Sequence, residues 1–369
     1  MTYRITEATA MLSTSALQNN FLRITRAAGV APENAFALIK ANAYGHGARE
    51  VASRLRAVGA RRFAVARLSE AIEVREVIHD CEIMILAPTD PTLVPDLLAG
   101  DFTQVVNCKE YADELSALVP RGKGLKIAFA VDCGMGRLGF PAVSGDPAAE
   151  ILSVARNDRF LPRSIYTHIP DADDPGGFAE KSVAIFRALL DKLAAKGLSL
   201  PAHFAASASI LRFGAAALPV IRPGLVLYGY DPAPHLPDPG LVPVMRLVAP
   251  ILQVRTFAPG ETVGYNRTYR IEKNTRVALL GIGYGDGFSR SCAGGRVTVG
   301  GKKCPLVGRI SMDLSSVALP DGLDVKPGDC AVLFGNSQAD LFALADRAGT
   351  IPYELLAGLA PRVKRVWAD

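Results

Sequence analysis

The chain has 369 residues, of which 49% are hydrophobic and 21% charged, and its formal net charge at pH 7 is +5. This composition is typical of a folded globular protein and not of a disordered chain, and the length allows about two domains. Basic residues are scattered and do not cluster with aromatic residues, so we expect no nucleic-acid partner. No apolar run reaches the roughly 18 residues of a membrane-spanning helix, and the first residues lack a signal-peptide pattern. We therefore expect no membrane partner and a cytoplasmic location.

The six cysteines are widely spaced and contain no Cys-x-x-Cys pair. They are Cys81, Cys108, Cys133, Cys292, Cys304 and Cys330. This spacing matches neither a zinc site nor a disulfide framework, and it suits a reducing cytoplasm. We therefore expect no metal site and no disulfide framework.

Eight short apolar runs alternate with mostly amphipathic stretches through the first two thirds of the chain. The runs cover residues 35–39, 63–66, 83–86, 103–106, 127–131, 164–168, 202–205 and 219–222. The clearest helical stretch covers residues 181–196, with apolar residues on one face and Gly197 at its end. Repeated β-α units predict a parallel sheet, and eight of them favour a closed barrel. An open doubly wound sheet is the alternative, because periodicity alone does not show closure.

The alternation ends near Tyr230, and five prolines follow between residues 231 and 243. Proline restricts the backbone and interrupts helices, so we interpret this segment as a stiff connector. β-rich runs come after it, at residues 247–254, 276–280, 297–299 and 331–334. The expected fold is therefore α/β. It consists of an N-terminal (β/α)8 TIM-like barrel, residues 1–235, and a C-terminal mostly-β domain, residues 236–369.

The first of these strands ends in Lys40, and Gly45 and Gly47 break the chain before a helical pattern begins at Ala48. In a β/α barrel, the chemistry is placed at the carboxyl ends of the strands. A lysine with apolar neighbours is poorly solvated, which lowers its pKa and increases the fraction of neutral amine. A neutral amine can form a Schiff base, which is how enzymes hold pyridoxal 5′-phosphate (PLP). Taken alone, Lys40 is also compatible with a solvated lysine after a strand.

Two more motifs lie at expected strand ends. Residues 132–140 contain three glycines, which allow a tight turn that presents Arg137. An arginine fork matches a carboxylate or a phenolate oxygen. The loop after the eighth strand holds Gly224, whose N–H can approach an oxygen in the usual phosphate site of a barrel. The glycine-rich residues 281–287 do not form a dinucleotide loop, because Asp286 takes the place of the third glycine and no helical pattern follows.

Taken together and in order, the motifs resemble those of the alanine racemase family across nearly the whole chain. The resemblance rests on residues 37–47, 132–140, 203–209 and 308–313, together with single residues between and after them. It implies a PLP-dependent racemase that interconverts L-alanine and D-alanine. It also implies a homodimer with shared active sites. In such a dimer, Lys40 serves one face of the α-carbon and Tyr265 of the second chain serves the other.

The resemblance implies four catalytic residues: Lys40, Tyr265, His168 and Arg222. His168 would lie in a hydrogen-bond chain to the tyrosine. Arg222 would face the pyridine nitrogen of PLP, which stays unprotonated because arginine keeps its own proton. The residues implied to bind the cofactor are Lys40, Tyr44, Arg137, Ser207, Arg222, Gly224, Leu225 and Tyr353. The residues implied to bind the substrate are Arg137, Met312 and Tyr284.

Three positions depart from the family pattern. Ala130 stands where many members have a lysine that orients the arginine, Ala206 replaces an asparagine, and Ser311 replaces a common cysteine. Because these changes leave the substrate preference open, a racemase for serine or another amino acid is one alternative. A non-catalytic PLP-carrier protein is a second, although such proteins resemble the barrel alone. A barrel-type PLP decarboxylase is a third, although we find none of the acidic substrate-binding motifs of those enzymes.

Overall fold

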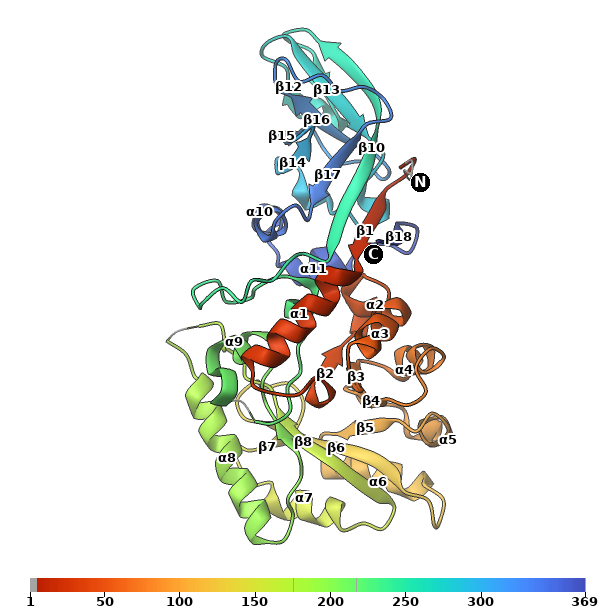
Figure 1. The fold of residues 1–369 in the computed structure, drawn as a ribbon, viewed down its shortest axis with the longest axis vertical. Coiled ribbons are helices and arrows are strands. Elements are labelled where there is room, and N and C mark those ends of the chain that lie inside the picture. Colours follow the sequence, from red (N-terminus) through yellow and green to blue (C-terminus); the bar gives the residue numbers. More distant parts are fainter. Residues whose placement is uncertain (1–4, 175, 217, 369) are drawn as a thin grey trace. The chain divides into compact units, whose positions relative to one another are not determined.

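The computed structural model describes residues 5–174, 176–216 and 218–368, and it divides into two compact units (Figure 1). The barrel unit comprises the described residues within 18–43 and 48–241. The β unit comprises residues 5–17, 44–47 and 242–368. The chain therefore leaves the barrel unit a few residues beyond the expected boundary at 235, and two short early segments belong to the β unit. The outermost positions of the two expected domains, 1–4 and 369, lie outside the described residues.

The barrel unit is built on a sheet of parallel strands. In the described residues the sheet order is β2 (Phe36–Leu38), β3 (Arg62–Val65), β4 (Glu82–Ile85), β5 (Thr103–Val106), β6 (Leu125–Asp132), β8 (Phe160–Thr167) and β9 (Ala202–His203), with β7 (Phe140–Pro141) beside β6. Most of these strands are largely buried, which is why they form short apolar runs in the sequence. Side chains from successive strands, among them Phe36, Ala64, Met84 and Val105, pack into one core cluster.

The eighth expected strand forms only isolated bridges. Ile221 pairs with Ala35, next to β2, and Arg222 pairs with Ala206, just after β9. The segment therefore pairs with both edges of the curled sheet, which links the first strand to the last. Pro223 follows and has no N–H to donate, which limits the ladder. The expectation of a TIM-like barrel is confirmed, and its eighth strand is shorter than the sequence predicts.

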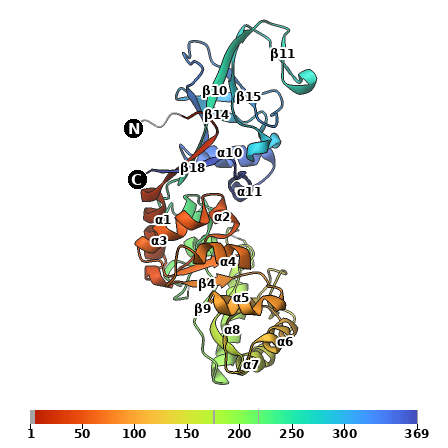
Figure 2. The same cartoon turned by 90° about the vertical axis from the view of Figure 1, so that its right-hand side faces the viewer.

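One helix, α1, precedes the first barrel strand and the others follow individual strands, and Figure 2 shows several of them succeeding one another along the barrel unit. Their bounds are α1 (Thr14–Ala27), α3 (Ala48–Ala57), α4 (Leu68–Arg75), α5 (Val94–Ala99), α6 (Lys109–Leu118), α7 (Ala148–Ala155), α8 (Ala179–Ala195) and α9 (Ser207–Phe213). α8 is the helix expected at residues 181–196, and it buries Val183, Phe186 and Leu193. Gly197 follows it with a φ of +87°, a conformation that favours glycine. Within the described ranges, no helix combines the length and apolarity needed to cross a membrane.

The β unit is a mostly antiparallel barrel. Its strands are β10 (Met245–Phe257), β13 (Thr275–Leu280), β14 (Arg296–Val299), β15 (Lys302–Val307), β16 (Ser315–Leu319) and β17 (Cys330–Phe334), with β1 (Thr9–Ser13) and β18 (Lys364–Ala368) added at one edge. β13 pairs with both β16 and β10, and this second pairing closes the barrel. The unit also contains the hairpin of β11 (Thr262–Val263) and β12 (Tyr269–Arg270), and the helices α10 (Gln338–Ala348) and α11 (Pro352–Ala357).

β1 is one of the strands that the sequence does not predict. It pairs antiparallel with β10 and parallel with β18, so the two ends of the described chain meet in one sheet. Its five residues alternate too briefly to give a periodic signal, and its partners are far away in the sequence.

Candidate active site

Lys40 begins a strained turn directly after β2. The element α2 (Lys40–Tyr44) is not a right-handed helix, because the four residues after Lys40 all have φ between 51° and 53°. This left-handed conformation costs roughly 1–2 kcal/mol for each residue that carries a Cβ, so surrounding contacts must hold it in place. The sequence predicts a turn broken by Gly45 and Gly47, but the strained residues come before both glycines.

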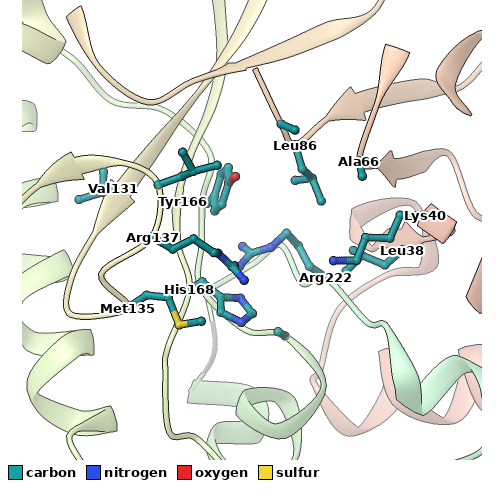
Figure 3. A pocket seen from close by; sticks show the side chains of 13 residues that line it. Leu38, Lys40, Ala66, Leu86, Val131, Met135, Arg137, Tyr166, His168 and Arg222 are labelled. Carbon is teal, nitrogen blue, oxygen red and sulfur yellow. The ribbon is translucent and has the colours of Figure 1, made fainter. Parts of the chain in front are cut away.

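Lys40 lines a cavity of about 210 Å³ at the carboxyl ends of the barrel strands (Figure 3). The lining residues are Leu38, Lys40, Ala66, Leu86, Ala87, Val131, Met135, Arg137, Leu138, Tyr166, His168, Ala206 and Arg222. Figure 3 shows Lys40 and Arg137 reaching towards Arg222 from opposite sides, with His168 close by. The structure therefore gathers four of the expected site residues around one cavity.

The cavity is electropositive. Its lining contains Lys40, Arg137 and Arg222, and none of the described residues that line it is acidic. Burial lowers the pKa of Lys40, Arg137 lowers it further, and Glu70 opposes both effects. The amine of Lys40 is therefore neutral more often than that of an exposed lysine. A cavity with this charge attracts anions such as phosphates and carboxylates.

His168 is neutral in this environment. Burial lowers its pKa to about 3, and the positive charges of Arg222, Arg137 and Lys40 act in the same direction. A neutral imidazole has one ring nitrogen that donates and one that accepts. His168 is therefore suited to relay a hydrogen bond and not to supply a positive charge.

Arg222 is buried and held by fixed acceptors. Its Nη1 donates to Nδ1 of His203 (2.5 Å) and its Nη2 donates to the Thr167 carbonyl (2.7 Å). Its guanidinium carbon lies 4.6 Å from the centroid of the Tyr166 ring. Burial, with a smaller contribution from Arg137, lowers the pKa of Arg222 to about 10. The guanidinium is therefore still a cation at neutral pH.

His203 does not line the cavity but supports Arg222, a role that the sequence does not predict. Because a guanidinium only donates, Nδ1 of His203 must be the acceptor in the bond from Arg222. Burial and the charge of Arg222 lower the pKa of His203 well below its ordinary value. The Tyr166 ring stacks on the imidazole at 5.3 Å. The motif at residues 203–209 draws attention only to Ser207, although His203 ends a strand at the same edge of the barrel.

Ser207 and Gly224 meet beside the cavity. The Gly224 N–H donates to Ser207 Oγ (3.1 Å), and Leu225 begins the 3-10 turn η4 (Leu225–Tyr228). A hydroxyl group and backbone N–H groups gathered at one spot form a site for a phosphate oxygen. The chemistry of this set, with Lys40 as the amine and Arg222 deep in the cavity, fits PLP.

Tyr44 and Tyr353 lie together in the β unit. Their ring centroids are 6.1 Å apart, and the ring planes are tilted by 45°. Burial and the neighbouring Tyr353 raise the pKa of Tyr44, so its phenol keeps its proton at neutral pH. The structure thus pairs two of the residues expected to contact the cofactor.

Three expected site residues, Tyr265, Tyr284 and Met312, are exposed on loops of the β unit. Their exposed fractions are 66%, 44% and 54%. The Tyr284 N–H donates to the Ser311 carbonyl (3.0 Å), and the Gly285 N–H donates to the Met312 carbonyl (2.8 Å). The loops that carry Tyr284 and Met312 are therefore joined through their backbones.

Arg362 joins the same two loops through side chains. Its Nε donates to Asp286 (2.7 Å) and its Nη2 donates to Asp313 (2.8 Å). The other oxygen of Asp286 accepts from the Gly283 N–H (2.8 Å). The Tyr265 loop packs on the second of these loops, since a Cβ added at Gly264 would lie 2.9 Å from the Arg309 nitrogen. The three loops therefore form one group.

The structure also locates the three departures from the family pattern. Ala130 is 2% exposed and belongs to the barrel core, and in the described part of the chain we find no hydrogen bond or ion pair to the Arg137 side chain. Ala206 lines the cavity directly before Ser207. The Ser311 carbonyl accepts a hydrogen bond from the Tyr284 N–H, and a cysteine at this position would supply the same carbonyl.

Comparisons with known proteins agree along nearly the whole chain. The family described as alanine racemase, N-terminal domain, matches residues 12–232, and alanine racemase, C-terminal domain, matches residues 244–367. The alanine racemase of Carboxydothermus hydrogenoformans is 37% identical over 360 residues, which are 95% of this chain and 96% of that protein.

Two solved structures are similar over nearly their full length. The biosynthetic alanine racemase of Pseudomonas aeruginosa superimposes with a TM-score of 0.89 at 32% identity, over 98% of this chain and 99% of that one. The alanine racemase of Bartonella henselae, solved with covalently bound pyridoxal phosphate, superimposes with a TM-score of 0.87 at 29% identity and the same coverage.

Proposed function

We propose a two-base mechanism for this chain, which belongs to the alanine racemase family and is a PLP-dependent alanine racemase. The observation that carries the proposal is the cavity in which Lys40 meets Arg137, His168 and Arg222 without an acidic neighbour in its described lining. When bound, PLP supplies an electron sink that weakens the bond between the α-carbon of an attached amino acid and its hydrogen.

Lys40 would hold the cofactor through Nζ, and once the substrate amine has displaced it, the freed Nζ would act as the base on one face of the substrate. Its pKa is lowered by burial and by Arg137, which increases the fraction of neutral amine that can accept a proton. The Ser207 hydroxyl and the Gly224 N–H bind the phosphate. Arg222 presents only donors and a positive charge, which disfavours a proton on any nitrogen that it faces.

Tyr265 serves the opposite face, and it does so in the site of a second chain. Inversion needs an acid/base group on each side of the α-carbon, and Lys40 covers only one side. A phenol is a weak acid and needs help to give up its proton before it can act as a base. The neutral imidazole of His168, backed by the positive charge of Arg222, supplies that help through a hydrogen bond.

The substrate carboxylate is bound by the Arg137 guanidinium and by the Met312 N–H of the second chain, with Tyr284 at the entrance. The high exposure of Tyr265, Tyr284 and Met312 on one group of loops supports a homodimer in which these loops are covered by the other chain. We also propose a cytoplasmic location, supported by six cysteines that are all free thiols.

The test is to incubate the purified protein with PLP and L-amino acids in heavy water and to separate the products by chiral chromatography. D-alanine that carries α-deuterium, formed faster than any other D-amino acid, supports both the two bases and the substrate. Faster inversion of serine would overturn the substrate. Exchange of the α-hydrogen without inversion would overturn the role of Tyr265, and no exchange despite bound PLP would favour a carrier.

A further inference from the structure

The turn that follows Lys40 raises the question of what holds it. Its four left-handed residues all carry side chains, so the conformation is unfavourable on its own. Asn42 gives one contact, because its Oδ1 accepts from the Ala48 N–H at the start of α3 (2.8 Å). The Ala43 N–H also donates to the Ile39 carbonyl (2.8 Å), and neither contact uses the N–H of Ala41, the first residue of the turn.

Glu70, in the first turn of α4, restrains the beginning. Its Oε1 accepts from the N–H of Ala41, the residue directly after Lys40 (2.6 Å). Its Oε2 accepts from the N–H groups of Ala66 (2.7 Å) and Arg67 (3.1 Å). One carboxylate therefore connects the ends of two neighbouring strands, β2 and β3. Hydrogen bonds to an ionised carboxylate are roughly twice as strong as neutral ones.

We propose that Glu70 is a positioning residue that holds Lys40 at the cavity by fixing the left-handed turn directly after it. The inference rests on the proposed role of Lys40 as the amine that binds PLP. It does not depend on Tyr265 or on the dimer.

A simpler role for Glu70 would be to cap its own helix. A glutamate at the third position of a helix commonly accepts from the backbone N–H before the first turn, and the bond from Arg67 fits that pattern. This cap uses only Oε2. The bond from Ala41 to Oε1 reaches 29 positions back along the chain, and helix capping does not require it. The two roles therefore predict different results for Lys40.

The charge of Glu70 acts on Lys40 as well. The charged and titratable groups around this amine are Arg137, Tyr166, His168 and Arg222 in the cavity, and Glu70 behind the turn. Of these, Glu70 is the one that raises the pKa of Lys40, against burial and Arg137. Because Glu70 is not among the residues that line the cavity, its charge does not face a bound anion there.

The experiment compares the full-length protein with the variants Glu70→Ala, Glu70→Gln and Glu73→Gln. Glu73 lies in the same helix and is exposed, so its substitution is a control for the loss of one negative charge from α4. Each protein is freed of PLP and checked for folding by circular dichroism. The labelling of Lys40 by trinitrobenzenesulfonate is then followed against pH by peptide mass spectrometry. The rate of PLP incorporation is measured by absorbance.

We expect Glu70→Ala to slow PLP incorporation about tenfold, as the loss of one strong hydrogen bond would. We expect Glu70→Gln to move the labelling midpoint of Lys40 to lower pH, because the charge that raises its pKa is gone. Glu73→Gln should change neither result. If Glu70 only caps its helix, Glu70→Ala lowers the melting temperature while the rate of PLP incorporation matches the wild type. That result would overturn the proposal.

A rescue variant distinguishes the effect of Glu70 on the left-handed turn from the effect of its charge on Lys40. Glycine adopts left-handed φ values without a steric cost, so Ala41→Gly added to Glu70→Ala should restore most of the incorporation rate. A slow rate that Ala41→Gly does not restore would overturn the role of the turn. Labelling of Lys40 requires no cofactor, so it tests Glu70 separately from the proposed function. Retention of covalently bound PLP by Lys40→Ala would instead contradict the proposed function.

Discussion

The barrel cavity and the exposed loops of the β unit fix their functional residues by different means. In the cavity, the Arg222 side chain is 3% exposed and its guanidinium is held by the fixed acceptors of His203 and Thr167. In the β unit, the side chains of Tyr265, Tyr284 and Met312 are exposed, and the loops that carry Tyr284 and Met312 are held by backbone bonds and by Arg362. Burial fixes the side chains of the cavity directly. On the loops, the backbone is fixed but the side chains stay exposed, so another surface can bury them.

The largest effect should come from the most exposed of these residues. Tyr265→Phe removes only the phenolic oxygen, and we expect racemisation to fall by about 10²- to 10⁴-fold, the usual contribution of a general acid or base. PLP binding, measured by absorbance, should be unchanged. Tyr269→Phe, a few residues along the chain and half-buried, is the control. A fully active Tyr265→Phe enzyme would show that the exposed loops do not supply the second base.

In the buried cavity, we expect His168 to make the free energy of unfolding depend on pH. Because the pKa of His168 is lowered in the folded protein, its neutral form contributes stability above the unfolded pKa of about 6.5. This contribution is lost as the pH falls towards 3, at about 1.4 kcal/mol per pH unit. Denaturant unfolding of His168→Gln should therefore show a shallower loss of stability between pH 6 and pH 4. His79→Gln, at an exposed histidine, should keep the wild-type slope, and equal slopes for both variants would refute this view of His168.

For the exposed loops, the test is to weaken the contact between two loops while leaving the functional side chains unchanged. Arg362→Gln weakens the link between the loops of Tyr284 and Met312, so we expect KM for alanine to rise about tenfold, as for the loss of a charge-assisted hydrogen bond. We expect kcat to change less, because both bases remain. Arg362→Lys should recover part of the loss, and Lys273→Gln, in an exposed ion pair with Asp321, should have no effect. A drop in kcat with an unchanged KM would contradict this role.

The smallest expected effect comes from a test of whether the exposed loops complete the cavity of their own chain or that of the second chain. Lys40→Ala and Tyr265→Phe chains are each expected to be inactive, but a mixed dimer would contain one intact site. Random mixing of equal amounts should therefore restore about a quarter of the wild-type specific activity. Activity measured after unfolding and refolding the two chains together gives the answer, with each chain refolded alone as the control. No recovery would mean that the loops act within their own chain.

The sequence predicts the parts of this site that depend on short-range pattern. Lys40, Arg137 and His168 follow strands that alternate with helices, and a parallel barrel brings the carboxyl ends of such strands to one rim. The eighth strand is overpredicted, because an apolar run does not reveal that Pro223 limits its ladder.

Other features depend on contacts that no local pattern records. The left-handed turn after Lys40 is built from residues that carry side chains, so glycine spacing does not locate it. His203 becomes recognisable only when Arg222, from another strand, donates to it. The exposed loops of the β unit meet through backbone bonds such as that from Tyr284 to Ser311, and backbone groups are the same for every sequence.

The parallel pairing of β1 with β18 has a consequence for the order in which the chain can assemble during translation. β1 is made long before its neighbours in the sheet, β10 and β18. At 5–20 residues per second, the ribosome needs roughly 20 to 70 s to proceed from β1 to β18. The barrel unit can collapse during that interval, while β1 waits with unpaired backbone groups. The β unit is therefore completed only when the last strand has left the ribosome.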